Sequence, residues 1–227
     1  GIGYEVDSET GLALITVEGV IAKRAPDSMC GPQIADIAKL DAHLIDCAND
    51  SHIRTVVIYL DTPGGCGIGL LETSENIADL RASGKRVIAY SEMLCASAGY
   101  WIASSCEKIF AAPSAQLGSI NAYIAAIDSS RAWEMQGLEL KLFRGGDLKA
   151  LGHPGKEWTA EEEEHLDQRA KQCAAQFKAH VSSHRPSLDE SAMRGQCFSA
   201  NEAPEGLVDG LYRSLTDLLA EELQLLS

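Results

Sequence analysis

The sequence predicts an α/β fold in which a mainly parallel sheet, built of ββα and βαβ units, is flanked by helices. Apolar runs of strand length alternate with segments of helical periodicity between Leu12 and Ala111. One of these runs, 54–60, is apolar without interruption, which is typical of a strand buried on both faces. After Pro154 the pattern becomes helical, so a C-terminal helical segment is expected to follow the sheet.

The first βαβ unit is predicted between Leu12 and Leu60. A strand rich in Leu, Ile and Val begins at Leu12, and Gly19 interrupts it. A helix is expected over 35–50, because its apolar residues recur at helical spacing on one face and charged residues occupy the other. The apolar strand 54–60 completes the unit.

The same alternation continues through a helix over 70–82, a strand over 85–90 and a short helix over 97–105. The uncharged segment 109–127 is long enough to raise the question of a membrane helix, but Pro113 and Gly118 interrupt it with turn residues. We therefore expect a strand over 108–111, a turn and a second strand. A further strand is expected over 138–143.

A long amphipathic helix is predicted to begin after Thr159, a residue suited to cap its first turn. Short helices are expected over 187–210 and 214–226. No linker or repeat divides the chain, so we expect one domain over 1–227, with 158–227 as its mainly helical C-terminal part.

Composition excludes several classes of function. The formal net charge of −14 argues against nucleic-acid binding and against a polybasic membrane surface. The seven cysteines show no CxxC pair, so we expect reduced thiols and no metal or cofactor. Reduced thiols favour the cytoplasm, and no transmembrane helix is expected. Because the sequence begins with Gly1 rather than Met, we leave open a leader or membrane anchor before it.

Two predicted βα turns carry residues suited to acyl transfer. The turn after the first buried strand contains Gly64 and Gly65, whose backbone amides could hold an oxyanion. The next turn places Ser97 at the start of a helix rich in small residues. Small residues also occur wherever a helix packs closely on a sheet, so the serine could be structural or nucleophilic.

A serine nucleophile needs a base, and no histidine follows a strand end where a triad partner would be expected. The loop 143–155 offers Lys149, and a lysine can act as general base when burial disfavours its charged form. Ser–Lys pairs are an established variant of the triad. Lys149 could equally be a solvated loop residue, and His153 is a competing base.

Three stretches in order, IRTVVIYLDTPGG, CASAGYWIASSCEKIFAAPSAQLGSI and GGDLKALGHP, resemble the signal peptide peptidase family of serine peptidases. That family includes phage head-maturation proteases and shares its fold superfamily with Clp protease and the crotonases. The resemblance implies a Clp/crotonase-like fold, a Ser97 nucleophile and a Lys149 general base. It also implies an oxyanion hole at Gly64, Gly65 and Ala98. The substrate would contact residues of the GSIN turn, namely Gly118, Ser119, Ile120 and Asn121, the last of which stands where the family usually has glycine.

The resemblance also implies that the chain cleaves extended peptides through an acyl-enzyme. It implies a homo-oligomer with active sites at subunit interfaces, because the family joins its serine and lysine across such boundaries. The protein would then work in the cytoplasm or, if phage-encoded, in the prohead. Two alternatives remain: a crotonase-like acyl-CoA enzyme, and an inactive relative that serves as an assembly or scaffold component.

Overall fold

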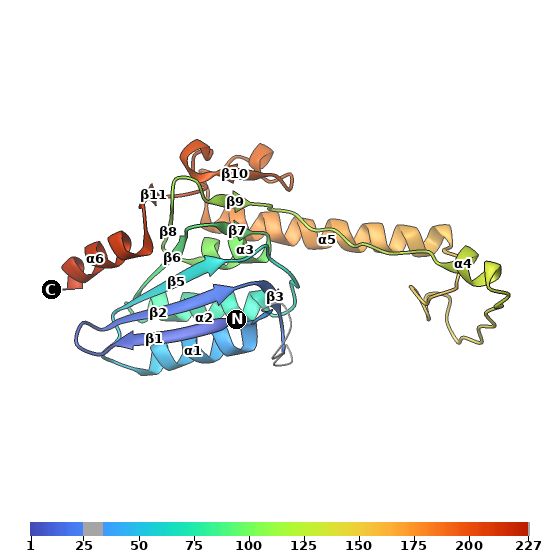
Figure 1. Ribbon diagram of the computed structural model, residues 1–227, viewed down its shortest axis with the longest axis horizontal. Coiled ribbons are helices and arrows are strands. Elements are labelled where there is room, and N and C mark those ends of the chain that lie inside the picture. The colour runs from blue at the N-terminus through green and yellow to red at the C-terminus, as the bar shows by residue number, and fades with distance from the viewer. Residues whose placement is uncertain (25–33, 227) are drawn as a thin grey trace. The chain divides into compact units, whose positions relative to one another are not determined.

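A computed structural model describes residues 1–24 and 34–226 of the chain (Figure 1). The chain divides into two compact units by its internal contacts. Unit 1 comprises Gly1–Asn121 together with Phe177–Ser227, and unit 2 comprises Ala122–Gln176. The expected nucleophile falls in unit 1 and the expected base in unit 2.

Unit 1 contains a six-stranded sheet in the order β1-β2-β5-β6-β8-β11. The strands are β1 (Ile2–Asp7), β2 (Leu12–Glu18), β5 (Thr55–Asp61), β6 (Arg86–Ser91), β8 (Lys108–Ala111) and β11 (Gly210–Leu211). Only the β1–β2 pair is antiparallel, and every other neighbouring pair is parallel. The prediction of a mainly parallel sheet is confirmed.

Three helices cover one face of this sheet: α1 (Ile37–Asn49), α2 (Leu70–Ala82) and α3 (Ala98–Ser105). In Figure 1, α1 and α2 run alongside the sheet strands on the same side. Asp36 caps α1 by accepting a hydrogen bond from the amide of Ala38. The strand side chains facing these helices, such as Ile15, Ile58 and Ala89, are fully buried in the main core.

The opposite sheet face packs against α6 (Leu215–Leu226). Leu218 and its partly buried neighbours on α6 meet Val57, Ile88 and Tyr90 of the sheet in a second, smaller cluster. Arg86 fixes this helix through bonds of 2.8 and 3.0 Å to the two carboxylate oxygens of Glu222. The predicted C-terminal helix is confirmed, because its leucines have an apolar sheet face to cover.

Two small sheets lie beside the main one. Strands β3 (Val20–Ala22) and β4 (Ile34–Asp36) pair in parallel. Strands β7 (Leu94–Ala96), β9 (Gln116–Gly118) and β10 (Cys197–Ser199) form a sheet in the order β10-β9-β7. The expected strand, turn and strand in segment 109–127 correspond to β8 and β9.

Unit 2 contains α4 (Ser130–Met135) and the first part of α5 (Ala160–His184), the predicted long helix. The expected strand over 138–143 is wrong: no described residue pairs with this segment. Its side chains alternate as in a strand, but a strand also needs a neighbour for its backbone groups. The alternating side-chain pattern therefore does not produce a strand here, because no neighbouring strand is present among the described residues.

The segment between α5 and α6 is also less helical than expected. It holds two single-turn 3₁₀ helices, Glu190–Ala192 and Ala200–Glu202, together with β10 and β11. Gly195, Pro204 and Gly206 break the sequence into pieces too short for a regular helix. Over the residues described, no helix combines the length and apolar character needed to cross a bilayer.

Candidate active site

Ser97 stands on a sharp turn between β7 and α3. Its backbone has φ 54° and ψ −122°, a conformation that non-glycine residues rarely adopt. The turn is held by the Ser97 amide, which donates to the carbonyl of Gly118 at 2.9 Å, and by the Ser97 carbonyl, which accepts from Trp101 at 3.0 Å. A strained strand–turn–helix elbow of this kind presents a serine hydroxyl away from the backbone. Within the described residues, the Ser97 hydroxyl has no hydrogen-bond partner.

The small residues around Ser97 serve the packing of α3, whose residues are all buried. A Cβ at Gly99 would lie 2.4 Å from Cγ2 of Thr62, the residue directly after β5. Glycine therefore lets the helix start against the sheet. The small residues are therefore needed for the packing of α3 against the sheet. This packing does not explain why a serine occupies residue 97.

The glycine turn after β5 lies directly against Ser97. Gly64 has φ 94°, and a Cβ there would lie 2.5 Å from the Cβ of Ser97 and 2.9 Å from the amide nitrogen of Ala98. The predicted meeting of the two βα turns is thus present in unit 1. Only glycine combines this backbone angle with this close approach.

Two backbone amides at this junction, those of Gly65 and Ala98, have no hydrogen-bond acceptor within residues 1–24 and 34–226. The Gly64 amide, by contrast, donates to the Thr62 hydroxyl at 3.0 Å. Gly64 therefore shapes the turn, whereas Gly65 and Ala98 have amides available for an oxyanion.

Thr62 supports the Gly64–Gly65 turn, although the sequence analysis does not identify it as a site residue. Its hydroxyl donates to the carbonyl of Gly19 at 2.7 Å and accepts from Gly64. Its backbone bonds Leu94 and Ala96, which fastens the glycine turn to β7. The sequence feature that could have indicated this role is the position of Thr62, directly before Pro-Gly-Gly and after a buried strand.

The GSIN turn borders the same elbow. The carbonyl of Gly118 accepts the hydrogen bond from the Ser97 amide. Ser119 has φ 53°, and its amide donates a hydrogen bond to the carbonyl of Gln196 at 2.8 Å. Ile120 is fully buried, and the Asn121 side chain donates to the carbonyl of Met193 at 3.4 Å. Ser119 and Asn121 remain partly exposed, so they are the members of the turn that a substrate could contact.

Lys149 lies in a turn of unit 2 and is exposed. Its amide donates to the carbonyl of Gly146 at 3.0 Å, and the next residue, Ala150, has φ 73°. Among the described residues, no carboxylate pairs with its ammonium group. Ser97 belongs to unit 1 and Lys149 to unit 2, and the pairing of the two side chains stays a prediction.

His153, the competing base, has a local role. Its Nδ1 bonds the carbonyl oxygen of Pro154 at 2.6 Å, and its ring meets Trp133 edge-on.

Glu162 stabilises the region that follows the lysine loop. Its side chain is 1% exposed, and it pairs with Lys156 and, at 3.4 Å, with Arg144. It also accepts the Thr159 amide at 3.0 Å while its own amide donates to the Thr159 hydroxyl, which completes a capping box. The hydrogen bond from Lys156 and that from the Thr159 amide lower the pKa of Glu162 to about 2. The predicted cap at Thr159 is confirmed.

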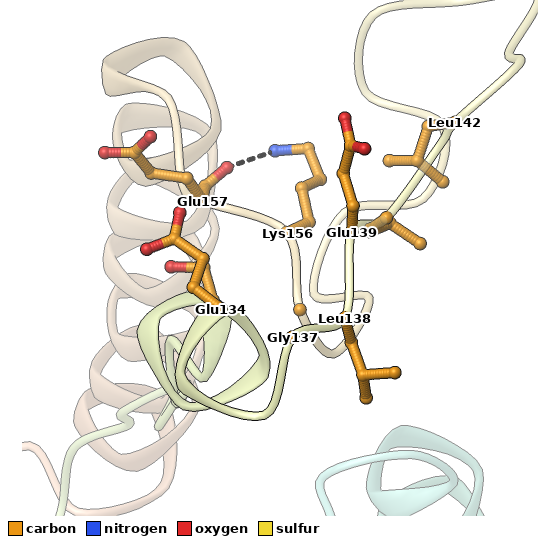
Figure 2. A pocket seen from close by; sticks show the side chains of 10 residues that line it. Glu134, Gly137, Leu138, Glu139, Leu142, Lys156 and Glu157 are labelled. Atoms are coloured by element: carbon orange, nitrogen blue, oxygen red, sulfur yellow. Dashed lines mark hydrogen bonds between the residues drawn. The ribbon is translucent and has the colours of Figure 1, made fainter.

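A hollow of about 570 Å³ occurs in unit 2 and contains none of the expected site residues. Figure 2 shows Lys156 within it, with the ammonium group donating to the backbone oxygen of Glu157. Leu138 and Leu142 lie along another side of it (Figure 2). Its lining combines the Ser130 hydroxyl with leucines and carboxylates but includes neither Ser97 nor Lys149, so the serine elbow remains the candidate reaction centre.

Comparison with known proteins identifies the family. Residues 79–225 match the family model described as Peptidase family S49. The chain belongs to peptidase family S49. The matched S49 region includes both Ser97 and Lys149, whereas the Gly64–Gly65 turn precedes it.

Two curated relatives illustrate the range of the S49 resemblance. The chain is 28% identical to capsid assembly protease C of Escherichia phage lambda, over 90% of this chain and 47% of that protein. It is 24% identical to a putative signal peptide peptidase SppA of Enterococcus faecium, over 96% of this chain and 65% of that protein. The chain thus spans about half to two thirds of these relatives' lengths.

A solved structure supports the fold. An enoyl-CoA hydratase/isomerase family protein from Silicibacter pomeroyi superposes with a TM-score of 0.54 at 17% identity, over all of this chain and 82% of that one. The expected Clp/crotonase-like fold is confirmed. At this level of identity the likeness concerns the fold alone.

Proposed function

We propose that this S49 chain is a serine endopeptidase in which Ser97 is the nucleophile and Lys149 the general base. The observation that carries the proposal is the strained Ser97 elbow packed against the glycine turn, where no described residue accepts a hydrogen bond from the Gly65 and Ala98 amides. Backbone strain persists where the surrounding structure enforces it, and it concentrates at reactive residues.

In the first half of the reaction, the Ser97 hydroxyl attacks the carbonyl carbon of a peptide bond while its proton passes to neutral Lys149. The oxyanion that forms is held by the amides of Gly65 and Ala98, each contributing about 3 kcal/mol to transition-state stabilisation. The C–N bond then breaks, and Lys149 returns the proton to the leaving amine. Ser97 is left as an ester.

In the second half, water attacks the ester carbonyl and gives a proton to Lys149. The tetrahedral intermediate collapses to release the carboxylic acid, and the proton returns to Ser97. No metal or cofactor is required by these steps.

The base is proposed to reach Ser97 within a homo-oligomer whose active sites lie at subunit interfaces. The two residues belong to different units, and Lys149 is exposed. Unit 2 carries large apolar side chains that are almost fully exposed, such as Tyr123 at 87%, Ile127 at 86% and Met135 at 89%. Contact with another subunit would bury such groups and would desolvate the lysine, which favours its neutral form.

The substrate is proposed to be an extended polypeptide that contacts Ser119 and Asn121 beside the elbow. Extended peptides bind through main-chain hydrogen bonds, and neighbouring pockets supply preference. We treat the two units as parts of one peptidase domain over 1–227, acting in the cytoplasm or, if phage-encoded, in the prohead. The phage and bacterial names of the relatives are compatible with either setting.

A fluorophosphonate probe tests the proposal, because it labels a serine only when a base and an oxyanion hole activate it. We expect labelling at Ser97, located by peptide mass spectrometry, and loss of labelling in Ser97→Ala. Absence of any adduct in the assembled oligomer would contradict the proposal. That result would favour an inactive scaffold relative or a crotonase-like acyl-CoA enzyme, which needs the amides but no nucleophilic serine.

A further inference from the structure

Segment 138–143, with the sequence Leu-Glu-Leu-Lys-Leu-Phe, has the side-chain pattern of a strand, but no strand of the described chain pairs with it. Among the described residues, no backbone hydrogen bond involves residues 139–143. Lys141 forms an ion pair with Glu139, two residues away, which places both side chains on one face as in a strand. The three leucines occupy the alternate positions and line the hollow of unit 2.

Several side chains of segment 138–143 are exposed to solvent. Leu138 is 50% exposed and Phe143 is 97% exposed, and the charged pair is mostly exposed as well. Figure 2 shows the backbone running from Leu138 past Glu139 to Leu142 along the rim of the hollow. A segment with a strand-like side-chain pattern, unsatisfied backbone groups and an apolar face can pair with an extended segment of another chain.

The sequence of the segment is complementary to itself in one register. In an antiparallel pair centred on Leu140, Leu138 faces Leu142 of the second copy, and Glu139 faces Lys141. A shift by one residue places leucine opposite charge, and a shift by two places Glu139 opposite Glu139 or Lys141 opposite Lys141. In-register parallel pairing also brings like charges together, which is destabilising.

We propose that segment 138–143 pairs antiparallel with the same segment of a second copy of this chain, across a two-fold axis at Leu140. The ribbon carries six leucines on one face and two Glu139–Lys141 pairs on the other. An isologous contact of this kind joins two chains and is self-limiting. It goes beyond the proposed function, which invokes subunit interfaces without assigning any segment to them.

A charge-exchange series tests the pairing. Glu139→Lys and Lys141→Glu each turn both cross-strand pairs into like-charge pairs, so each should raise the dissociation constant of self-association about tenfold. The double variant Glu139→Lys/Lys141→Glu restores opposite charges and should return the constant to that of the parent chain. Sedimentation velocity across a concentration series measures all four proteins.

Cysteine cross-linking tests the register. Leu140→Cys places two thiols at the two-fold axis, where facing Cβ atoms lie about 5 Å apart, close to the separation that a disulfide needs. Phe143→Cys is the matched control, because residue 143 would face residue 137 rather than its own copy. Under mild oxidation we expect a disulfide-linked dimer above the parent's background for Leu140→Cys alone.

The proposal is overturned if the double variant self-associates no better than the single variants, or if both cysteine variants cross-link equally. These results are independent of fluorophosphonate labelling at Ser97 in the parent chain. Labelling without charge rescue would overturn the strand pairing and leave the peptidase proposal standing. Charge rescue without labelling would do the reverse.

Discussion

Gly64 lies so close to Ser97 that a methyl group at residue 64 would stand 2.5 Å from the Cβ of Ser97. Two turns separated by more than thirty residues in sequence thus share one small volume. Because neither turn can shift without displacing the other, the position of the serine depends on the absence of a side chain at Gly64.

Gly64→Ala should therefore damage both stability and the site. The substitution combines a positive φ with contacts to Ser97, Ala96 and Ala98 that are too short, so we expect a loss of about 2 kcal/mol or more and no labelling at Ser97. Thermal unfolding and the fluorophosphonate probe measure the two effects. Gly67→Ala is the matched control, because a Cβ there meets nothing within 4 Å. Equal behaviour of the two variants would contradict the packing described.

Ser97→Ala and Lys149→Ala should each lower peptide cleavage by at least about a thousandfold, whereas His153→Ala should leave it nearly unchanged.

Mixing the Ser97→Ala and Lys149→Ala variants distinguishes an active site at a subunit interface from a site within one chain. Each inactive variant carries the residue that the other lacks, so reassembled equimolar mixtures should recover up to about a quarter of the parent activity. Failure of reassembled mixtures to recover activity would place serine and lysine in one chain.

Glu162→Gln should destabilise unit 2, since it removes a buried carboxylate that pairs with Lys156 and Arg144 and completes the capping box. The pKa of Glu162 is lowered to about 2 in the folded chain, against a value near 4.5 when unfolded. The stabilisation is thus fully present above about pH 4.5 and is lost as the pH falls toward 2. Thermal unfolding should show a gap between parent and variant that closes over this range.

The exposed Glu161 in the same helical turn provides the control for that experiment. Glu161→Gln should follow the parent at every pH. A gap of similar size for Glu161→Gln would show that helix-start charge, rather than the buried pairs, is responsible.

His180 should make the folded chain less stable in mild acid. Burial, followed by the nearby His184, lowers the pKa of His180 to about 4, while its ring stacks on Trp101 and its Nε2 lies 3.1 Å from the Ser105 hydroxyl. The unfolded chain binds the proton more readily, so stability present above about pH 6.5 declines toward pH 4. His180→Phe keeps an aromatic ring without the titration, and its unfolding temperature should vary less over this range. An unfolding temperature that falls as steeply with acid in His180→Phe as in the parent chain would contradict this role of His180.

The parts of the fold that the sequence predicts well are those with a strong local signal. The helix expected over 70–82 matches α2, which begins after Gly69 in a left-handed conformation that glycine favours. The strand over 108–111 matches β8, an apolar run bounded by turns. By contrast, β1 carries no comparable signal, because its edge position leaves its second half exposed.

The failures occur where structure depends on a partner that the sequence does not reveal. The pattern of residues 138–143 is that of a strand, yet pairing is a property of two segments, and no described segment supplies the second. The site shows the same limit. The sequence motifs indicate Ser97 and the glycine turn. They do not reveal that the Gly64 amide donates a hydrogen bond to the Thr62 hydroxyl, because this bond depends on side-chain geometry that the spacing of residues in the sequence does not specify.

The positive φ of Ser97 implies a trade between thermal robustness and reactivity at this one residue. Ser97→Gly would relieve the backbone at its elbow, whereas Ser97→Ala would retain the strain while losing the same hydroxyl. Of the two variants, the glycine form should unfold at the higher temperature. The parent chain would thus be less heat-resistant than this variant, and the glycine form would be the better reagent for testing whether the proposed site retains uncleaved peptides.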